Sequence, residues 1–235
     1  MNVVLVYSRL YIDCLRRAFT SVRKNPLTLF LPAIVLVCFQ LISLIAGRLG
    51  FLGGILISLA FDALASCYLY FLGEVVANSS ISLKEWRNSL MAYFWSIINV
   101  NFVIWIATMV LSAVLRSVPN GAVLMSALYL VAVVALNAAP EVIYQKGTYG
   151  GLATMQASLG FIQENWIEWL LPSLFLLAGF YYLMPWLLGF GFLSLIGVAI
   201  AGALIHLTMV FRGHLFETLS TSSHRQRIFK FKNAA

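Results

Sequence analysis

The sequence predicts an all-α, polytopic membrane protein with about six transmembrane helices, arranged as three parallel repeats of an amphipathic helix followed by a helical hairpin. Three observations predict this fold class: long apolar runs, a one-sided distribution of basic residues, and internal sequence similarity. Hydrophobic residues make up 62% of the chain and charged residues only 10%, whereas soluble domains contain about 25% charged residues. A water-soluble chain of 235 residues could not bury so much apolar surface.

Six apolar runs are long enough to cross a bilayer. The hydrocarbon core is about 30 Å thick and requires roughly 20 apolar residues in a helix. The runs are Pro26–Ala46, Gly50–Gly73, Met91–Leu115, Ala122–Ala139 with an extension to Tyr144, Trp166–Leu183, and Trp186–Phe211 after a turn at Pro185. They predict a single membrane domain over residues 1–235, in which residues 26–211 form a six-span bundle and residues 212–235 form a basic cytoplasmic tail.

The positions of Lys and Arg orient this bundle. Of the 15 basic residues, all but Arg48 and Arg116 fall in segments on one side of the predicted membrane. Basic residues in short loops stay in the cytoplasm, so we expect both termini to be cytoplasmic. No removable signal peptide is expected. Because topology accounts for the net charge of +7, no nucleic-acid partner is expected; the tail either contacts anionic headgroups or is solvated.

The first 25 residues are expected to form an amphipathic helix in the plane of the lipid headgroups. Its predicted apolar side contains Val4, Tyr7, Tyr11, Cys14, Ala18 and Val22, joined by Leu15 and Phe19. Its other side contains the interfacial basic residues Arg9, Arg16, Arg17, Arg23 and Lys24, together with Asp13. The lipid bilayer is therefore an expected partner, with anionic headgroups as candidate contacts.

Two segments of the chain resemble each other, and a third resembles them more faintly. Residues 15–38 overlay residues 155–178 without a gap, and a third copy begins at Trp86. The matched polar and proline positions are Asn25 with Asn165 and Pro32 with Pro172. Each copy begins on the cytoplasmic side, which predicts parallel repeats related by an axis along the membrane normal.

Polar residues inside the predicted spans form two candidate sites. Asp62 lies midway along the second span, with Ser58 and Ser66 on the same helix face. An ionisable residue at this depth indicates either a proton or cation relay or a protonated or capped side chain that fastens two helices. Asn137 and Glu141 lie one turn apart at the cytoplasmic end of the fourth span, where interfacial salt bridging is the simplest role for the carboxylate.

No motif indicates an enzyme, a metal site or a cofactor. Ser194 and His206 lie on the same predicted helix, about 18 Å apart, too far for a nucleophile and its base. The sequence contains no P-loop, zinc-protease or dinucleotide motif. The cysteines at 14, 38 and 67 have no metal-ligand spacing, and we expect them to be packing residues.

The segment from Pro140 to Trp166, and the opening sequence RRAFTSVRKNPLTLFLP, resemble a known family. Both are similar to the six-helix bacterial inner-membrane proteins that include YciC, and to the membrane domain of some glycerophosphodiester phosphodiesterases. The shared features are Glu141, Lys146 with Gly147, Ser158, and Asn165 before Trp166. The resemblance implies the fold and a location in the cell inner membrane, and it carries no catalytic residue onto this chain.

Three functional hypotheses follow. The first is a non-enzymatic scaffold, assembly factor or subunit of a membrane complex, with other membrane-protein subunits as partners. The second is a transporter or an ion- or proton-conducting bundle that uses Asp62. The third is a lipid-handling protein that uses the surface helices and a groove between repeats.

Overall fold

The computed structural model describes residues 3–77, 86–147, 150–188, 193–222 and 226–227. Within these ranges, side chains are not described at 3–5, 86–87, 175–188 and 193–195. The last eight residues of the predicted basic tail lie outside the described residues.

The regular secondary structure of the described residues is entirely helical. The α-helices are α1 (Val3–Lys24), α2 (Leu31–Ala46), α3 (Gly50–Val76), α4 (Trp86–Ala92), α5 (Phe94–Leu115), α6 (Gly121–Ala135), α7 (Ala139–Lys146), α8 (Gly151–Leu188) and α9 (Leu193–Thr221). Two short 3-10 helices, η1 (Pro26–Phe30) and η2 (Gly47–Leu49), flank α2. The all-α prediction is confirmed.

Four helical segments of the described chain are long and apolar enough to cross a membrane. They are Pro26–Val76, Phe94–Leu115, Gly121–Lys146 and Ile196–Thr221. In water these segments would expose a large apolar surface, whereas lipid solvates such a surface and the helices satisfy their own backbone groups. The chain is therefore compatible with a membrane protein, as its composition predicts.

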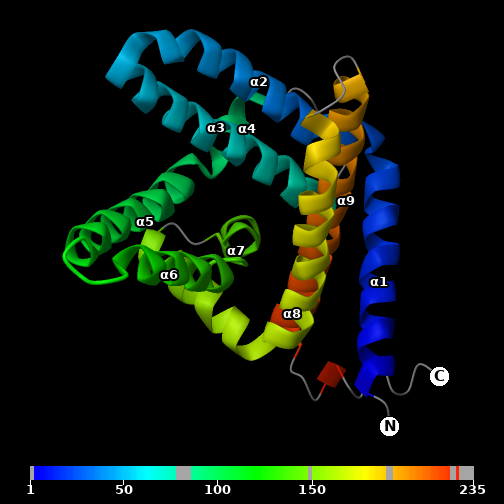
Figure 1. Cartoon of the computed structure of the whole chain (residues 1–235). Helices are drawn as coiled ribbons and strands as arrows, with labels where there is room; N and C mark the ends of the chain where they lie inside the picture. The colour runs from blue at the N-terminus through cyan, green and yellow to red at the C-terminus, as the bar shows by residue number, and fades with distance from the viewer. Residues whose placement is uncertain (1–2, 78–85, 148–149, 189–192, 223–225, 228–235) are drawn as a thin grey trace.

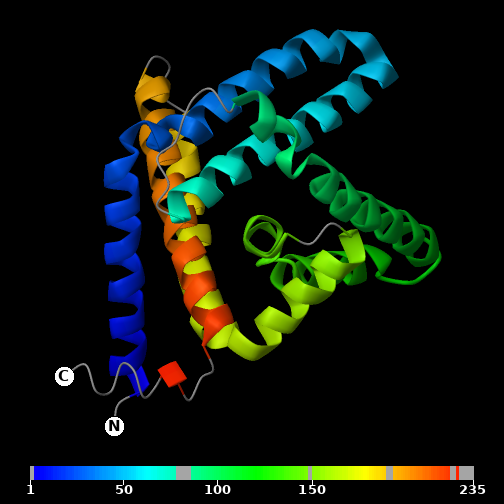
Figure 2. The ribbon, with the colours of Figure 1, turned by 180° about the vertical axis from the view of Figure 1, so that it is seen from behind.

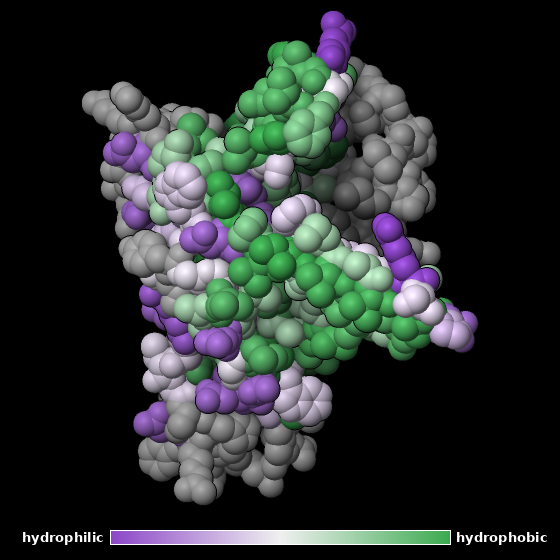
Figure 3. All heavy atoms as spheres, turned by 90° about the vertical axis from the view of Figure 1, so that its left-hand side faces the viewer, coloured by the Kyte–Doolittle hydropathy of each residue, from purple (hydrophilic) through white to green (hydrophobic). Residues whose placement is uncertain are grey.

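The helices form two extended hairpins and one upright group. Helices α2 and α3 form one hairpin and α5 and α6 another; both extend to the same side of the molecule and diverge (Figure 1). Helix α1, the part of α8 that follows its kink at Asn165, and α9 run beside one another (Figures 1 and 2). Apolar residues cover the hairpins, with hydrophilic residues at the tips (Figure 3), and Arg48 and Arg116 lie in the turns that close the hairpins.

The buried core lies where the bases of the hairpins meet α1, α8 and α9. One cluster joins Leu10 of α1, Val142 of α7, Trp169 of α8 and Phe216 of α9. A second cluster joins α1, α3, α7 and α9 through residues such as Leu72. The polar side chains described below are held by this core.

Glycine permits the closest contact between α8 and α5. A Cβ atom on Gly151 would overlap the backbone oxygen of Asn99 and lie only 2.7 Å from the carbonyl carbon of that residue. Gly147 ends α7 with φ of +63°, a left-handed conformation that glycine adopts without strain. These positions fix the path of the chain between the second hairpin and α8.

Two predicted boundaries need correction. The predicted span from Ala122 to Tyr144 is divided into α6 and α7 by a turn over residues 136–138, because Pro140 cannot donate a backbone hydrogen bond and starts a new helix. The turn predicted at Pro185 is wrong, since α8 continues through this residue to Leu188.

The predicted tail and the predicted apolar face of α1 also differ from the structure. Helix α9 continues past residue 212 to Thr221, because Leu215, Phe216 and Leu219 pack in the core. On α1, Leu15 and Phe19 are exposed, at 42% and 54%. They form a separate apolar stripe, while Cys14 and Ala18 face the core.

Candidate functional site

A buried ion pair between α7 and α9 lies at the centre of the polar residues. The Arg212 guanidinium donates through Nε and Nη2 to the two carboxylate oxygens of Glu141, at 2.9 and 3.1 Å. Glu141 is 0% exposed and Arg212 7% exposed. The planar guanidinium matches a carboxylate in this two-bond geometry, so the charges compensate each other out of water.

Asn137 extends this ion pair into a network that reaches α8. Its side-chain oxygen accepts hydrogen bonds from Trp169 Nε1 at 2.9 Å and Ser173 Oγ at 3.2 Å. Its backbone carbonyl accepts from Arg212 Nη2, and the Arg212 guanidinium lies 4.7 Å from the centre of the Trp169 ring. The sequence-predicted pair of Asn137 and Glu141 thus joins α7, α8 and α9 at the end of α6.

Asp62 makes a separate contact between the two hairpins. It is 4% exposed, and its Oδ1 accepts a hydrogen bond from Asn101 Nδ2 on α5 at 2.7 Å. Ser66, four residues further along α3, donates to the Ser89 carbonyl and accepts from the Tyr93 backbone N–H. Ser58 is exposed. Of the three predicted residues, Asp62 therefore contacts α5, Ser66 contacts α4, and Ser58 faces outward.

We expect Asp62→Asn to retain this contact, because an amide oxygen can still accept from Asn101. The thermal unfolding temperature of the purified protein should change by less than about 2 °C, whereas Asp62→Leu should lower it by about 3 °C, since one interhelical hydrogen bond in a membrane protein contributes about 1 kcal/mol. In proteoliposomes, Asp62→Asn should leave the proton permeability measured with a pH-sensitive dye unchanged. A loss of proton flux in this variant would instead favour the relay hypothesis.

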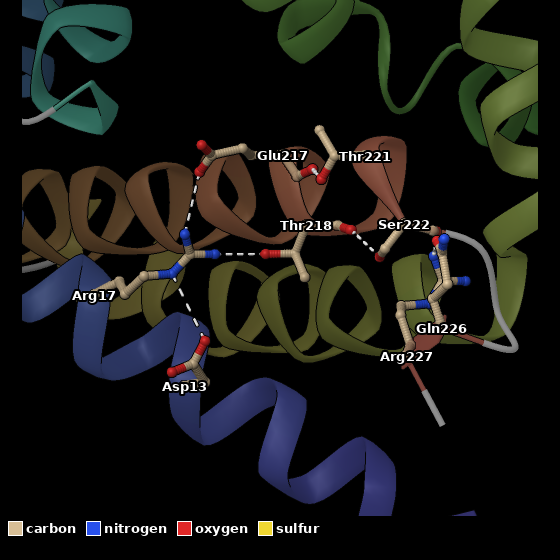
Figure 4. Close-up of a pocket in the computed structure, with 8 residues that line it drawn as sticks. All are labelled: Asp13, Arg17, Glu217, Thr218, Thr221, Ser222, Gln226 and Arg227. Atoms are coloured by element: carbon tan, nitrogen blue, oxygen red, sulfur yellow. Dashed lines mark hydrogen bonds and ion pairs between the residues drawn. The ribbon is translucent and has the colours of Figure 1, made fainter. Parts of the chain in front are cut away.

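The five predicted interfacial basic residues of α1 divide into two groups. Arg16, Arg23 and Lys24 are exposed, and Arg9 is half-buried. Arg17 faces α9, where it donates to Glu217 Oε2 at 3.2 Å and to the Thr218 hydroxyl. Figure 4 shows Arg17 between Asp13 of its own helix and these two residues. Arg17 therefore belongs to the contact between α1 and α9 and not to the outward-facing basic surface.

A serine, a histidine and a carboxylate also meet between α1 and α9. Ser21 Oγ lies 3.0 Å from His214 Nε2, and His214 Nδ1 lies 3.6 Å from Glu217 Oε2. This is the order of a serine hydrolase triad, but Ser21 is 0% exposed and His214 1% exposed. A substrate carbonyl cannot reach the hydroxyl, and 3.6 Å exceeds a hydrogen bond. The group joins two helices and is not arranged for acyl transfer.

A second buried arginine, Arg227, contacts α8 at its kink. Asn165 has non-helical backbone angles, φ −131° and ψ 24°, within α8. Its side-chain oxygen accepts from Arg227 Nη2 at 2.9 Å, and the same guanidinium lies 3.6 Å from Glu168. The sequence pattern placed Arg227 in a solvated or lipid-contacting tail, but the structure buries it to 5% exposure.

Burial also controls the titration of two α1 side chains. Burial, reinforced by the Glu168 carboxylate, raises the pKa of Tyr11 to about 12. Burial raises the pKa of the Cys14 thiol as well. Both groups therefore remain neutral near pH 7, and a buried neutral thiol is a poor nucleophile.

No protein-family model, curated protein or solved structure matches this chain. Any functional conclusion therefore depends on the chain's own geometry. Among the residues that the structure describes, no group of three or more His, Cys, Asp or Glu side chains is placed to hold a metal ion.

Proposed function

We propose that this chain is a non-catalytic, multi-pass inner-membrane protein that serves as a scaffold or assembly subunit for other membrane proteins. The exposure of the two hairpins carries the proposal. In the most apolar 18-residue stretch of each of the segments Pro26–Val76, Phe94–Leu115 and Gly121–Lys146, only 11% is buried within the chain, against 33% for Ile196–Thr221. The two hairpins thus present most of their side chains to lipid or to helices of other subunits.

We further propose six membrane crossings with both termini in the cytoplasm. As a single helix, the 51 residues of Pro26–Val76 would be about 76 Å long, more than twice the hydrocarbon thickness. The segment is divided at Gly47–Leu49 into two helices that form a hairpin, which supports two crossings. The basic turn residues Arg48 and Arg116 would then lie on the outer side.

The backbone at three helix junctions supports the threefold repeat. Asn25 precedes the first hairpin and has φ −130°, and Tyr93 precedes α5 of the second hairpin and has φ −122°. Asn165, with φ −131°, precedes the apolar part of α8, which is followed by α9. Each is a non-helical residue between an amphipathic or short helix and an apolar helix. We propose that the chain consists of three such repeats and that it shares its fold with the YciC-like proteins.

A pair of small residues on α3 supports contact with another helix. Gly54 and Ser58 are both exposed, and a Cβ atom on Gly54 would meet nothing within 4 Å. They lie four positions apart on one helix face, and small residues in this spacing let transmembrane helices approach closely. This face is therefore suited to a partner helix.

Blue-native electrophoresis of the protein solubilised in mild detergent tests the proposal. We expect the wild type to migrate as a complex larger than the 26.1 kDa chain, and the Gly54→Leu/Ser58→Leu variant to shift toward the monomer because the added side chains separate the helices. Ala107→Leu, an exposed small residue on α5, is the matched control and should leave the complex intact. A wild-type protein that migrates as a lone monomer contradicts the scaffold proposal.

A further inference from the structure

An apolar groove lies beside α1, where this helix meets α8 and α9. Its volume is about 480 Å³. Its lining includes Tyr11 and Phe211, whose ring centres are 6.3 Å apart. The other lining residues are Ile12 and Leu15 of α1, Leu171 and Pro172 of α8, and Leu207 and Thr208 of α9. We call this space the α1 groove.

The α1 groove offers an occupant carbon surfaces and few free polar groups. The Tyr11 hydroxyl donates to the Glu168 carbonyl at 3.0 Å, and the Thr208 hydroxyl donates to the Leu204 carbonyl at 2.7 Å. The side-chain hydroxyls of its lining are thus already paired within the chain. An apolar segment would therefore fit the groove better than a polar ligand would, because nothing polar would need to be desolvated.

The groove is continuous with the surface that would face lipid. Leu171 is 47% exposed, and nearby positions of the same two helices, Leu174 on α8 and Leu204 on α9, are 62% and 47% exposed. On α1, Ile12 and Leu15 line the groove and are themselves 58% and 42% exposed. An acyl chain can therefore enter the groove from the bilayer without crossing a polar barrier.

A row of arginines lies next to this apolar stripe on α1. Arg9, Arg16 and Arg23 recur at intervals of seven residues, which places them on one side of the helix. Arg16 directly follows Leu15 and is four positions after Ile12, and both Arg16 and Arg23 are exposed. Positive charge is thus available on α1 next to the residues that line the groove.

We propose that the α1 groove binds one acyl chain of an anionic phospholipid, with the phosphate held by Arg16 and Arg23. Charge complementarity selects an anionic phospholipid over a neutral one, because exposed basic residues near a bilayer attract anionic headgroups. The apolar lining and the paired hydroxyls select an acyl chain. All residues of the site belong to one chain, so the site depends on membrane insertion but not on the scaffold role, and it can be tested in whatever oligomeric state the protein is purified.

Native mass spectrometry of the purified protein, with bound lipid counted per chain, can test this site. The protein would be incubated in detergent with equal amounts of dioleoyl phosphatidylglycerol and dioleoyl phosphatidylcholine. We expect wild-type protein to retain phosphatidylglycerol preferentially, and Arg16→Gln/Arg23→Gln to reduce that preference about tenfold. The matched control is Arg48→Gln/Arg116→Gln, which removes the same charge at the hairpin tips and should keep the preference.

Substitutions that fill the α1 groove test whether it holds an acyl chain. Thr208→Trp should reduce retention of both lipids at least about fivefold, because the indole would occupy the space of the acyl chain. Ile12→Trp, at a 58% exposed position of the lining, provides a second filled groove if Thr208→Trp does not fold. Equal retention of the two lipids by the wild type, loss of the preference in the hairpin-tip control, or wild-type retention by a folded groove-filling variant would each overturn the site.

Discussion

Replacing Arg212 by methionine is expected to destabilise the fold by about 3–5 kcal/mol, the largest effect that we predict for a single substitution. The substitution leaves the Glu141 carboxylate, which is 0% exposed, without its two charged hydrogen bonds. It also removes the cation above the Trp169 ring and the donor to the Asn137 carbonyl. Thermal unfolding of the detergent-solubilised protein, followed by tryptophan fluorescence, would measure the loss as a lower Tm.

Two further variants distinguish the stability cost of leaving a buried charge unpaired from the cost of removing side-chain atoms. Glu141→Gln combined with Arg212→Met should recover part of the stability, because no buried charge remains. Arg17→Met removes an arginine whose ion pair with Glu217 is half exposed, at 37% and 50%, and should cost only about 1 kcal/mol or less. If Arg212→Met unfolded at the wild-type temperature, the buried pair would not be a structural centre of the fold.

Gly151→Ala is expected to have the second-largest effect, about 1–3 kcal/mol, because it overpacks a backbone contact. The new methyl group would overlap the Asn99 carbonyl oxygen and lie 2.7 Å from its carbon, and neither atom belongs to a flexible side chain. Helices α5 and α8 would have to separate. The same fluorescence-detected unfolding measurement should show a lower Tm.

Gly160 supplies the matched control on the same helix. A Cβ atom there would meet nothing within 4 Å, so Gly160→Ala should leave the Tm unchanged or raise it slightly, as alanine favours helix more than glycine does. Equal Tm values for the Gly151 and Gly160 variants would mean that α8 does not approach α5 as closely as the structure indicates.

The fold class was predictable because lipid solvation imposes a simple pattern on the sequence. Apolar runs such as Gly50–Gly73 mark helices, since no other short segment satisfies its backbone in hydrocarbon. The helix boundary at Asn25 was also predictable, because the following proline disfavours helix at the residue before it. These signals are local, and each is contained in a short stretch of sequence.

The partners in the polar network were not predictable, because they are distant in sequence. Glu141 and Arg212 are 71 residues apart, and Ser21 and His214 are 193 residues apart. Arg212 directly follows the last apolar run, so its charge looked like the start of a solvated tail. Only the packing of α9 against α1 and α8 reveals that the helix continues and that the charge is buried.

The divergence of the two hairpins could not be predicted from the sequence either. Apolar periodicity identifies helices but gives no angle between them, and lipid provides no hydrophobic force that would drive them together. The close contact of α2 with α9 depends on Gly202, where a Cβ atom would lie 3.2 Å from the Ala33 nitrogen. A single glycine in an apolar run gives no indication of such a partner.

The side of the membrane on which the hairpin turns lie tests the proposed topology most directly. Arg48→Cys and Arg116→Cys would be introduced singly after removal of the cysteines at 14, 38 and 67, with Lys24→Cys as the cytoplasmic control. In intact cells, a membrane-impermeant maleimide that reaches only the outer face of the inner membrane should label positions 48 and 116 but not 24. Labelling of 48 and 116 only from the cytoplasmic side, in inverted vesicles, would contradict paired crossings that begin and end in the cytoplasm.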